Sequence, residues 1–334
     1  MKKKSISIKE IAKLSGVSVS TVSRVLNNTG RFSEATQKKV VSVAQKYNYH
    51  QSIIAQGMRR GSLSIVGIIV PDITNSYYAS IVKKCEQYFF NLGYLTIVCN
   101  TDRSPKLEKR YIKQLSSHIV DGLIVISSQK QISPKDSEIS IPTVFIDRFP
   151  KLASNIIITS SDDYSGALLA TNHLIDNDAY PVMVTTKTSG FSSNQKRVKG
   201  FKDTLVSRKI NEIEIITLAA HSDNIYSEKS TLSRKLLDLI KKYKKVGIFA
   251  VNDNVAAFIY QIAKEKNILI PDQLSIVGFD DSPIAKEMQL TTIHQDTDKL
   301  AITSCNNLIK LFKNNKILER KIVIPVSLIK RKTT

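Results

Sequence analysis

The sequence predicts an α/β protein in which three short N-terminal helices precede two doubly wound subdomains built on parallel sheets. From residue 63 onward, short apolar runs alternate with amphipathic helical segments, which is typical of parallel strands covered on both faces. Charge is also unevenly distributed. Residues 1–61 hold 12 basic and two acidic side chains, whereas the rest of the chain holds 37 and 27. A compact basic segment is typical of nucleic-acid binding.

The first two predicted helices are separated by a glycine turn. Ser7 and Glu10 form a capping-box pattern that opens the first helix. Its apolar side consists of Ile8, Ile11, Ala12 and Leu14. Gly16 allows a tight turn, and Ser18 caps a second helix over residues 19–26. This second helix is expected to bury Val22, Val25 and Leu26.

Helix, turn and helix in this order form the helix-turn-helix motif, whose second helix enters the major groove of DNA. The hydroxyls of Ser20 and Thr21 can bind bases or phosphates, and Arg24 can bind a guanine edge with two hydrogen bonds. Ser33 caps a third helix over residues 34–47, with Val40, Val41, Ala44 and Tyr47 on its core side. The DNA-binding residues expected here are Val19, Ser20, Thr21, Arg24, Asn27 and Ser33.

Nine apolar segments of the remaining chain are predicted strands, which is too many for one doubly wound sheet and indicates two. These strands are 63–70, 95–99, 122–126, 142–146, 156–159, 182–186, 213–217, 246–251 and 274–278. Helices fit between most of them, including 105–117, 164–176, 194–208, 228–242 and 253–266. A further helix has Tyr78, Ile81, Val82, Cys85, Phe89 and Leu92 at helical spacing.

Several classes of protein are disfavoured. No two glycines stand two positions apart, so the dinucleotide-binding G-x-G-x-x-G turn is absent, and no Walker loop, G-x-S-x-G elbow or nucleophile–base set marks an enzyme. Three cysteines without C-x-x-C spacing indicate free thiols, and the five histidines show no metal-ligand spacing. We therefore expect no metal, no cofactor and no catalytic residue. Without an apolar run of membrane-spanning length or a signal-peptide core, we expect a cytoplasmic protein.

The N-terminal stretch S-I-K-E-I-A-K-L-S-G-V-S-V-S-T-V-S-R-V-L-N-N resembles the signature of the LacI/GalR family. The remainder resembles the effector domain of that family, which is similar to periplasmic sugar-binding proteins, through V-P-D-I-T-N-S-Y-Y, F-I-D-R, R-V-K-G-F, F-A-V-N-D, V-G-F-D-D and T-T-I-H-Q. The resemblance covers almost the whole chain. It implies a homodimeric repressor of carbohydrate-utilisation genes that binds double-stranded, pseudo-palindromic operator DNA and is released by a sugar or sugar-acid effector.

The resemblance also implies a domain organisation. Residues 1–50 would form the DNA-binding headpiece, 51–61 a hinge and 62–334 the effector and dimerisation domain. Within that domain, subdomain one would comprise 62–161 and 294–323, and subdomain two would comprise 162–293 and 324–334.

In the family, the hinge folds as a helix on the operator and inserts an apolar side chain into the minor groove. Met58 matches that side chain, Ala55 matches the small residue one turn earlier, and Arg59 would contact phosphate. This hinge departs from the family pattern, because Gln-Ser replaces Pro-Asn at its start and Gly57 lies in its middle. A glycine inside a helix costs about 1 kcal/mol relative to alanine, so this hinge is expected to be harder to fold.

Polar residues that match family contacts lie where predicted strands end, which is where ligands bind in doubly wound sheets. Carboxylates accept hydrogen bonds from sugar hydroxyls, guanidinium groups donate them, and aromatic rings contact the apolar sides of a sugar ring. The expected effector-binding residues are Asn75, Tyr77, Tyr78, Asp147, Arg148, Arg197, Asn252, Phe279, Asp280 and Gln295.

Some alternatives stay open from the sequence. Asp253 and Asp281 could cap the helices that follow them, and Tyr78 could belong to the core. N-T-D-R-S-P-K-L-E-K-R-Y-I and F-I-D-R resemble regulators of 2-keto-3-deoxygluconate or uronate use, in which Arg148, Arg197 and Lys187 would hold a carboxylate. Neutral pentoses and hexoses fit much the same residues. A corepressor ligand, a phosphocarrier partner or a sugar-transport role are the alternative functions.

Overall fold

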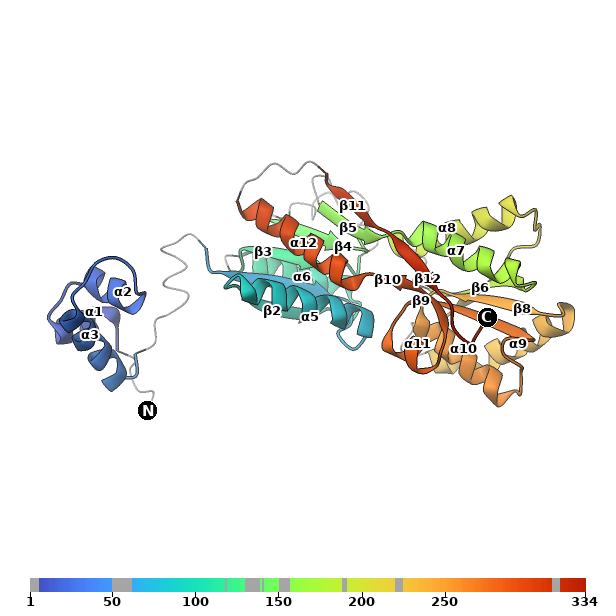
Figure 1. Cartoon of the computed structure of the whole chain (residues 1–334), viewed down its shortest axis with the longest axis horizontal. Coiled ribbons are helices and arrows are strands. Elements are labelled where there is room, and N and C mark those ends of the chain that lie inside the picture. Colours follow the sequence, from blue (N-terminus) through green and yellow to red (C-terminus); the bar gives the residue numbers. More distant parts are fainter. Residues whose placement is uncertain are drawn as a thin grey trace. The chain divides into compact units, whose positions relative to one another are not determined.

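The structure is a computed structural model that describes residues 6–49, 62–117, 119–129, 139, 141–149, 157–187, 191–219, 225–313 and 319–334. The chain divides into two compact units, Met1–Leu63 and Ser64–Thr334 (Figure 1). The predicted hinge, with Ala55, Met58 and Arg59, lies outside the described residues. Among the described helices, none combines the length and the apolar content that crossing a bilayer requires.

The N-terminal unit contains three helices, α1 (Ile8–Ser15), α2 (Val19–Leu26) and α3 (Glu34–Lys46). Each begins at a serine N-cap, as the sequence predicts, and the capping box of α1 is present. Gly16 ends α1 in the left-handed conformation at φ 64°, which a glycine adopts without strain. The fully or nearly fully buried apolar side chains are Ile11, Ala12, Val22, Val25, Val40 and Ala44.

Two core predictions for this unit are wrong. Leu14 is 48% exposed, because Ile11, Ala12 and Ser15 form the inward face of α1 and Leu14 lies at its margin. Tyr47 is 45% exposed, since α3 ends at Lys46 and Tyr47 no longer continues its helical face. Tyr49 packs against the core instead.

The first sheet of the second unit has strand order β11-β5-β4-β3-β1-β2, and all its pairs are parallel. Its strands are β1 (Ile65–Val70), β2 (Leu95–Asn100), β3 (Gly122–Val125), β4 (Thr143–Ile146), β5 (Ile157–Ser161) and β11 (Lys321–Ile324). Its helices are α5 (Ser76–Asn91), α6 (Pro105–Ser116) and α12 (Thr297–Phe312). One apolar cluster joins the sheet to α5 and α12, and a second joins its other face to α6. The sheet is therefore covered on both faces.

The second sheet has strand order β12-β10-β9-β8-β6-β7. Its strands are β6 (Tyr180–Thr186), β7 (Glu214–Leu218), β8 (Val246–Ala250), β9 (Leu274–Asp280), β10 (Thr291–Gln295) and β12 (Val326–Ile329). The helical elements are α7 (Asp163–Asp176), α8 (Ser192–Ser207), η2 (Ile225–Glu228), α9 (Lys229–Lys242), α10 (Asp253–Glu265) and α11 (Pro283–Glu287). The chain passes between the sheets after β5, after β10 and after β11 (Figure 1).

The predicted fold class is confirmed, and all nine predicted strands are present with ends within two residues of the prediction. One pairing differs, because β12 runs antiparallel to β10 whereas the other strands of that sheet are parallel. The predicted inward position of Leu92 is wrong. Leu92 follows the last residue of α5 as its C-cap and is 50% exposed.

Candidate DNA-binding helix and ligand pocket

The outer surface of α2 carries a group of hydroxyls and one guanidinium. The Ser18 hydroxyl lies 2.7 Å from the Ser20 hydroxyl and 2.8 Å from that of Thr21, and it accepts the Thr21 N–H at 3.1 Å. Val19, Ser20 and Arg24 are exposed, and Thr21 is half-buried. The hydroxyls are therefore held near the N-terminus of α2, where a recognition helix meets base edges.

The other two predicted DNA contacts of this unit have local structural roles. Asn27 is the C-cap of α2, and its amide donates to the carbonyl of Ser23 at 2.7 Å. Ser33 caps α3 by accepting the Thr36 N–H at 3.2 Å, and it remains exposed. A capping serine with an exposed hydroxyl can still contact phosphate.

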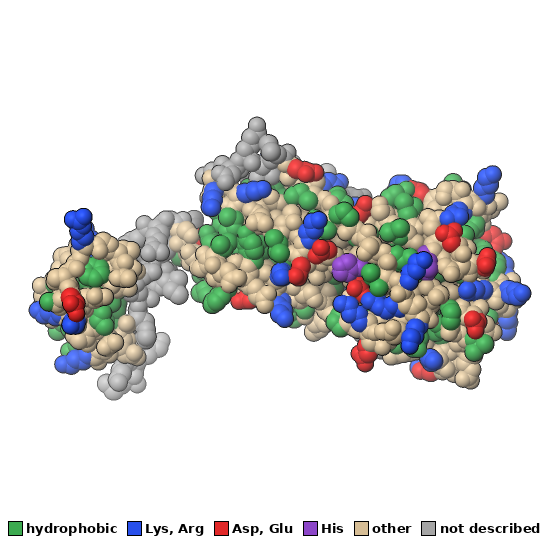
Figure 2. Space-filling model, viewed as in Figure 1, with side chains coloured by type: hydrophobic (Ala, Val, Ile, Leu, Met, Phe, Trp, Pro, Cys, Tyr) green, Lys and Arg blue, Asp and Glu red, His purple; other side chains and the backbone are tan. Residues whose placement is uncertain are grey.

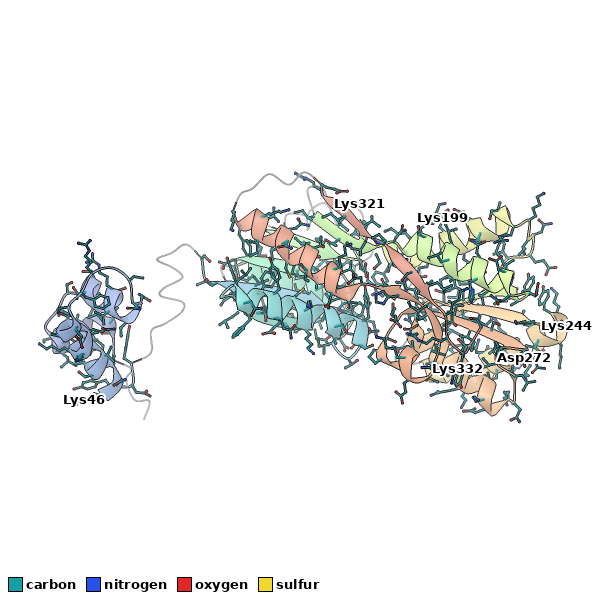
Figure 3. The ribbon with its side chains drawn as sticks, viewed as in Figure 1. Lys46, Lys199, Lys244, Asp272, Lys321 and Lys332 are labelled. Atoms are coloured by element: carbon teal, nitrogen blue, oxygen red, sulfur yellow. The ribbon has the colours of Figure 1, made fainter. Side chains whose placement is uncertain are left out.

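Basic side chains surround the helices of the first unit. Lys9, Lys13, Arg31, Lys39 and Lys46 are exposed, and Lys38 forms an ion pair with Glu34 at 2.8 Å. Lys46 projects from the end of α3 (Figure 3). In the second unit the labelled lysines project at well-separated places, including Lys199, Lys244, Lys321 and Lys332 (Figure 3). These labelled lysines are therefore not gathered in one patch.

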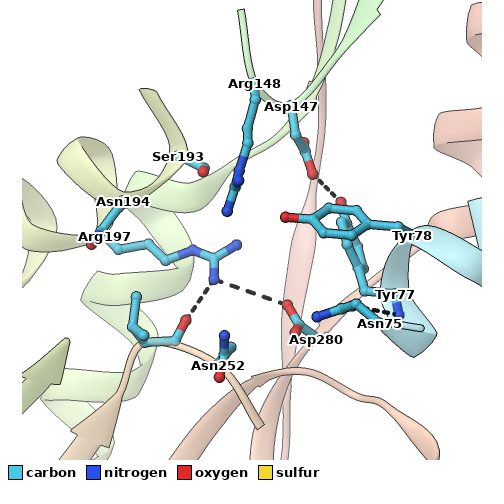
Figure 4. A pocket seen from close by; sticks show the side chains of 11 residues that line it. Asn75, Tyr77, Tyr78, Asp147, Arg148, Ser193, Asn194, Arg197, Asn252 and Asp280 are labelled. Carbon is cyan, nitrogen blue, oxygen red and sulfur yellow. Dashed lines mark hydrogen bonds and ion pairs between the residues drawn. The ribbon is translucent and has the colours of Figure 1, made fainter. Parts of the chain in front are cut away.

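A polar pocket lies where the carboxyl ends of strands from both sheets face each other (Figure 4). Its empty volume is about 500 Å³, open solvent included. The start of α5, the turn after β4, helix α8, the turn after β8 and the end of β9 all contribute to it. The lining residues are Asn75, Tyr77, Tyr78, Asp147, Arg148, Ser193, Asn194, Arg197, Val251, Asn252 and Asp280.

Arg197 is buried and already has several partners. Its Nε donates to Asp163 Oδ1 at 2.8 Å and its Nη1 donates to the Val251 carbonyl at 2.6 Å. Nη1 also lies 3.9 Å from Asp280 Oδ1 (Figure 4). The guanidinium carbon is 3.6 Å from the centroid of the Phe279 ring. The charge of Arg197 is therefore largely balanced by protein carboxylates.

A buried series of polar contacts links the two sides of the pocket. The Tyr77 hydroxyl donates to Asp147, and it also lies 3.3 Å from Gln295 Oε1. Gln295 Nε2 donates to Asp280 Oδ1 at 2.7 Å. Asp147 Oδ1 accepts the backbone N–H of Ser161 at 2.8 Å. These contacts fix two carboxylates that originate from different sheets.

Burial raises the pKa values of the acidic groups that these contacts join. Burial, with the neighbouring charge of Asp163, raises the pKa of Asp147. Burial also raises the pKa of Asp280 well above its usual value, although Arg197 opposes the shift. The pKa of the Tyr77 hydroxyl is likewise raised, by burial and by Asp147. Hydrogen-bond donors from a ligand would relieve the desolvation of both carboxylates.

Arg148 differs from Arg197. Its guanidinium lies 4.4 Å from the centroid of the Phe191 ring and 5.6 Å from that of Tyr78. It forms no ion pair with a carboxylate in the described part of the chain. It is therefore the pocket cation with capacity for a ligand oxygen.

Eight of the ten predicted effector contacts line the pocket, and Phe279 and Gln295 do not. Phe279 is fully buried beneath Arg197, and Gln295 lies behind Asp280, so both support lining residues. Three further lining residues were not predicted, namely Ser193, Asn194 and Val251. Ser193 and Asn194 lie in the first turn of α8, which begins at Ser192, two residues before the predicted start at 194. A correct start for this helix would have placed both residues beside Arg197, which was predicted. Tyr78 lines the pocket and also packs in the core.

The suggested capping role of two aspartates is wrong. Asn252 caps α10, since its side chain accepts the Val255 N–H at 2.9 Å. Asp253 is fully buried and accepts hydrogen bonds from Ser282 and Thr292. Asp281 instead forms an ion pair with Arg331 at 2.5 Å and lies 3.1 Å from His294.

A basic helix-turn-helix unit followed by a two-sheet unit with a polar pocket defines a ligand-binding transcriptional regulator. The family profile described as "Bacterial regulatory proteins, lacI family" matches residues 7–52. The profile described as "Periplasmic binding proteins and sugar binding domain of LacI family" matches residues 64–332. The chain belongs to the LacI family, as its sequence motifs predict.

Individual relatives agree with this assignment. The ribose operon repressor of Halalkalibacterium halodurans is 31% identical over 329 residues, which are 98% of this chain and 96% of that protein. A periplasmic binding protein/LacI transcriptional regulator from Alkaliphilus metalliredigens, complexed with D-xylulofuranose, is 30% identical with a TM-score of 0.71, over 81% of this chain and 99% of that chain. The Lac repressor bound to ONPG covers 99% of this chain and 100% of its own with a TM-score of 0.84, and at 23% identity it shows the fold.

Proposed function

We propose that this protein is a homodimeric repressor whose operator affinity is lowered by a small sugar bound in the pocket between the two sheets. The observation that carries the proposal is the buried chain from Asp147 through Tyr77 and Gln295 to Asp280, which joins pocket groups of both sheets. A ligand that binds these groups would change the preferred orientation of the two sheets relative to each other. It must bind the operator-free state more tightly for DNA affinity to fall.

The proposed operator contacts are on α2. Two identical headpieces of a dimer would read a pseudo-palindromic site, because the symmetry of the protein matches that of the DNA. Ser20, Thr21 and Arg24 are the proposed base-reading side chains, and the surrounding lysines contact phosphate. The proposed place of action is the cytoplasm, where the genomic DNA lies.

The side chains of the pocket suit a sugar that has several hydroxyl groups and one oxygen that accepts hydrogen bonds from a guanidinium group. Asp147 and Asp280 would accept from hydroxyls, and Asn252 can donate and accept. Arg148 would donate to a carbonyl, ring or carboxylate oxygen. Because Arg197 is already balanced by Asp163 and Asp280, only one pocket cation has capacity for a sugar acid. The relatives named for ribose and bound to D-xylulofuranose support a pentose.

The proposed dimer surface includes the edge of the first sheet. Among the described residues, β2 is the last strand of that sheet, and a sheet edge with apolar side chains favours association. The exposed apolar residues there are Phe90, Leu92, Leu95 and Val98. Figure 2 shows hydrophobic side chains gathered over the region of α5, β2 and β3.

The test is a titration of the full chain on a labelled duplex from its own promoter region. D-ribose, D-xylulose, 2-keto-3-deoxygluconate and glucuronate are added separately. We expect one of them to weaken binding to the promoter duplex and to raise the melting temperature of the protein by mass action. Tighter DNA binding on addition of a sugar would contradict release and indicate a corepressor. Equal affinity for the promoter and a random duplex would contradict the DNA-binding proposal.

A truncated chain separates the two activities. Deleting residues 1–61 should abolish promoter binding and leave the thermal shift with the active sugar unchanged. Loss of both activities in a folded truncated protein would contradict an independent sugar site.

A further inference from the structure

Outside the pocket, a buried carboxylate organises the segment that follows β3. Glu108 lies in the first turn of α6 and is fully buried. Its carboxylate accepts the Ser127 hydroxyl at 2.7 Å, the Gln129 side-chain amide at 2.8 Å and the backbone N–H of Ser128. The Ser127 hydroxyl oxygen also accepts the backbone N–H of Gln129 at 3.0 Å. One side chain thus fixes three consecutive residues.

The same segment contacts the turn that presents two pocket residues. The Ser127 N–H donates to the carbonyl of Arg148 at 3.3 Å. From the other side, the Ser192 hydroxyl donates to the carbonyl of Asp147 at 3.0 Å. Asp147 has φ 54°, a left-handed conformation that side-chain-bearing residues rarely adopt unless their surroundings hold them. The turn is therefore held between Ser127 and Ser192.

We infer that Glu108 is a positioning residue of the ligand pocket, which it shapes by fixing Ser127–Gln129 against the Asp147–Arg148 turn. The inference rests on the proposed function, since it explains how the side chains of the proposed sugar pocket are held in position. Burial raises the pKa of Glu108 against the effect of its hydrogen bonds, so a carboxylate is a costly core residue here. An apolar side chain would fill the same space but would leave the Ser128 N–H without its partner.

Two variants at Glu108, a control variant and a substitute for the first, all in the full chain, test this inference. Glu108→Met keeps the length of the side chain but removes all the acceptors. Glu108→Gln keeps one carbonyl oxygen for Ser128, and because the Ser127 hydroxyl and the Gln129 amide can reverse their roles, it should restore the wild-type behaviour. Leu115→Met is the control, since Leu115 is a buried residue of the same helix that belongs to an apolar cluster. Ser127→Ala replaces Glu108→Met if that variant does not fold.

Backbone amide hydrogen exchange is the first measurement and needs no ligand. In Glu108→Met, the amides of residues 127–129 and 147–148 should exchange about tenfold faster or more, as expected for a lost buried hydrogen bond. Exchange in β8 should not change. Glu108→Gln and Leu115→Met should match the wild type. Faster exchange at 127–129 with unchanged exchange at 147–148 would overturn the inference.

Affinity for D-ribose and D-xylulose is the second measurement. Glu108→Met should bind the sugar that binds the wild type about tenfold more weakly, because a displaced hydrogen-bonding turn costs on that order. An affinity equal to that of Leu115→Met would overturn the inference. If the wild type binds neither these sugars nor the two sugar acids, the proposed function fails, and the exchange result alone decides whether Glu108 positions the turn.

Discussion

At the scale of single residues, this protein uses buried carboxylates where an apolar core would be less costly. Asp147, Asp163, Asp253 and Asp280 each lie at or near the carboxyl ends of strands, and each accepts a hydrogen bond from another element. A buried carboxylate is tolerated when its hydrogen bonds are satisfied. Their common position indicates that they shape the pocket and its supports.

Asp253 should make folding stability depend on pH. Burial raises its pKa to about 6 from a usual 3.8, so the folded state favours the protonated form. Its contribution to stability is therefore fully present below about pH 4 and is lost as the pH rises through 6, by about 3 kcal/mol in total. Denaturant unfolding of the wild type and Asp253→Asn from pH 4 to 7 measures this. A constant difference between the two across that range would contradict the assignment.

Arg197→Met should destabilise the second unit strongly. It removes the partner of Asp163 and leaves two carboxylates buried near each other, which costs about 3–5 kcal/mol for a broken buried pair. Lys199→Met is the matched control on the same helix, because its ion pair with Asp203 lies at the surface and contributes little. Thermal unfolding distinguishes them. Equal melting temperatures would show that Arg197 is not required for packing.

At the scale of elements, one face of α2 packs in the core of the headpiece and the other is available to contact DNA bases. Val22 and Val25 pack into the core of the headpiece, whereas Ser20 and Arg24 remain exposed. The stem of Arg24 passes over Gly30, where an added Cβ atom would lie 3.4 Å from Arg24 Cδ. A side chain at position 30 would therefore meet the stem of Arg24.

Arg24→Ala should weaken promoter binding and relax its sequence preference. Losing a two-bond guanine contact costs about 1–3 kcal/mol, or roughly 5- to 150-fold in affinity. Lys38→Ala should instead weaken binding to promoter and random duplex by the same factor and lower the salt dependence. Anisotropy titrations with both duplexes at two salt concentrations measure the two effects. An equal loss on both duplexes for Arg24→Ala would assign Arg24 to phosphate.

Secondary-structure elements were also the level at which the sequence was most informative. Long apolar runs such as Ile65–Val70 are unambiguous, because a parallel strand buried on both faces has no polar positions. Predictions failed at the ends of elements. Leu92 and Tyr47 continue an apolar pattern but lie just beyond the helices, where the chain turns and the face they would share no longer exists.

At the scale of the whole molecule, the proposed regulation requires that sugar binding and DNA binding occur in one assembly. The edge strand β2 and its exposed apolar neighbours are the proposed subunit contact. Operator affinity then depends on protein concentration, since two headpieces bind as one unit only in the dimer.

Leu95→Asp should shift the protein toward monomer and weaken promoter binding. Leu95 is 48% exposed at the start of β2, and a carboxylate at an apolar contact must be desolvated. Val206→Asp is the control, because Val206 is 69% exposed on α8 and lies outside the proposed surface. Sedimentation equilibrium gives the mass of each. A Leu95→Asp protein with the mass and promoter affinity of the wild type would place the subunit contact elsewhere.

The alternation of strands and helices, the capped helix-turn-helix and most of the polar residues at the strand ends could be predicted from the sequence alone, because they depend on local periodicity and capping. Which charges have partners depends on the folded chain. Arg148 and Arg197 look equivalent in the sequence, yet Asp163 and Asp280 balance only Arg197. Tertiary structure also placed Phe279 and Gln295 behind the pocket and joined Glu108 to the Asp147–Arg148 turn. Such contacts unite residues far apart in the chain, and no local pattern records them.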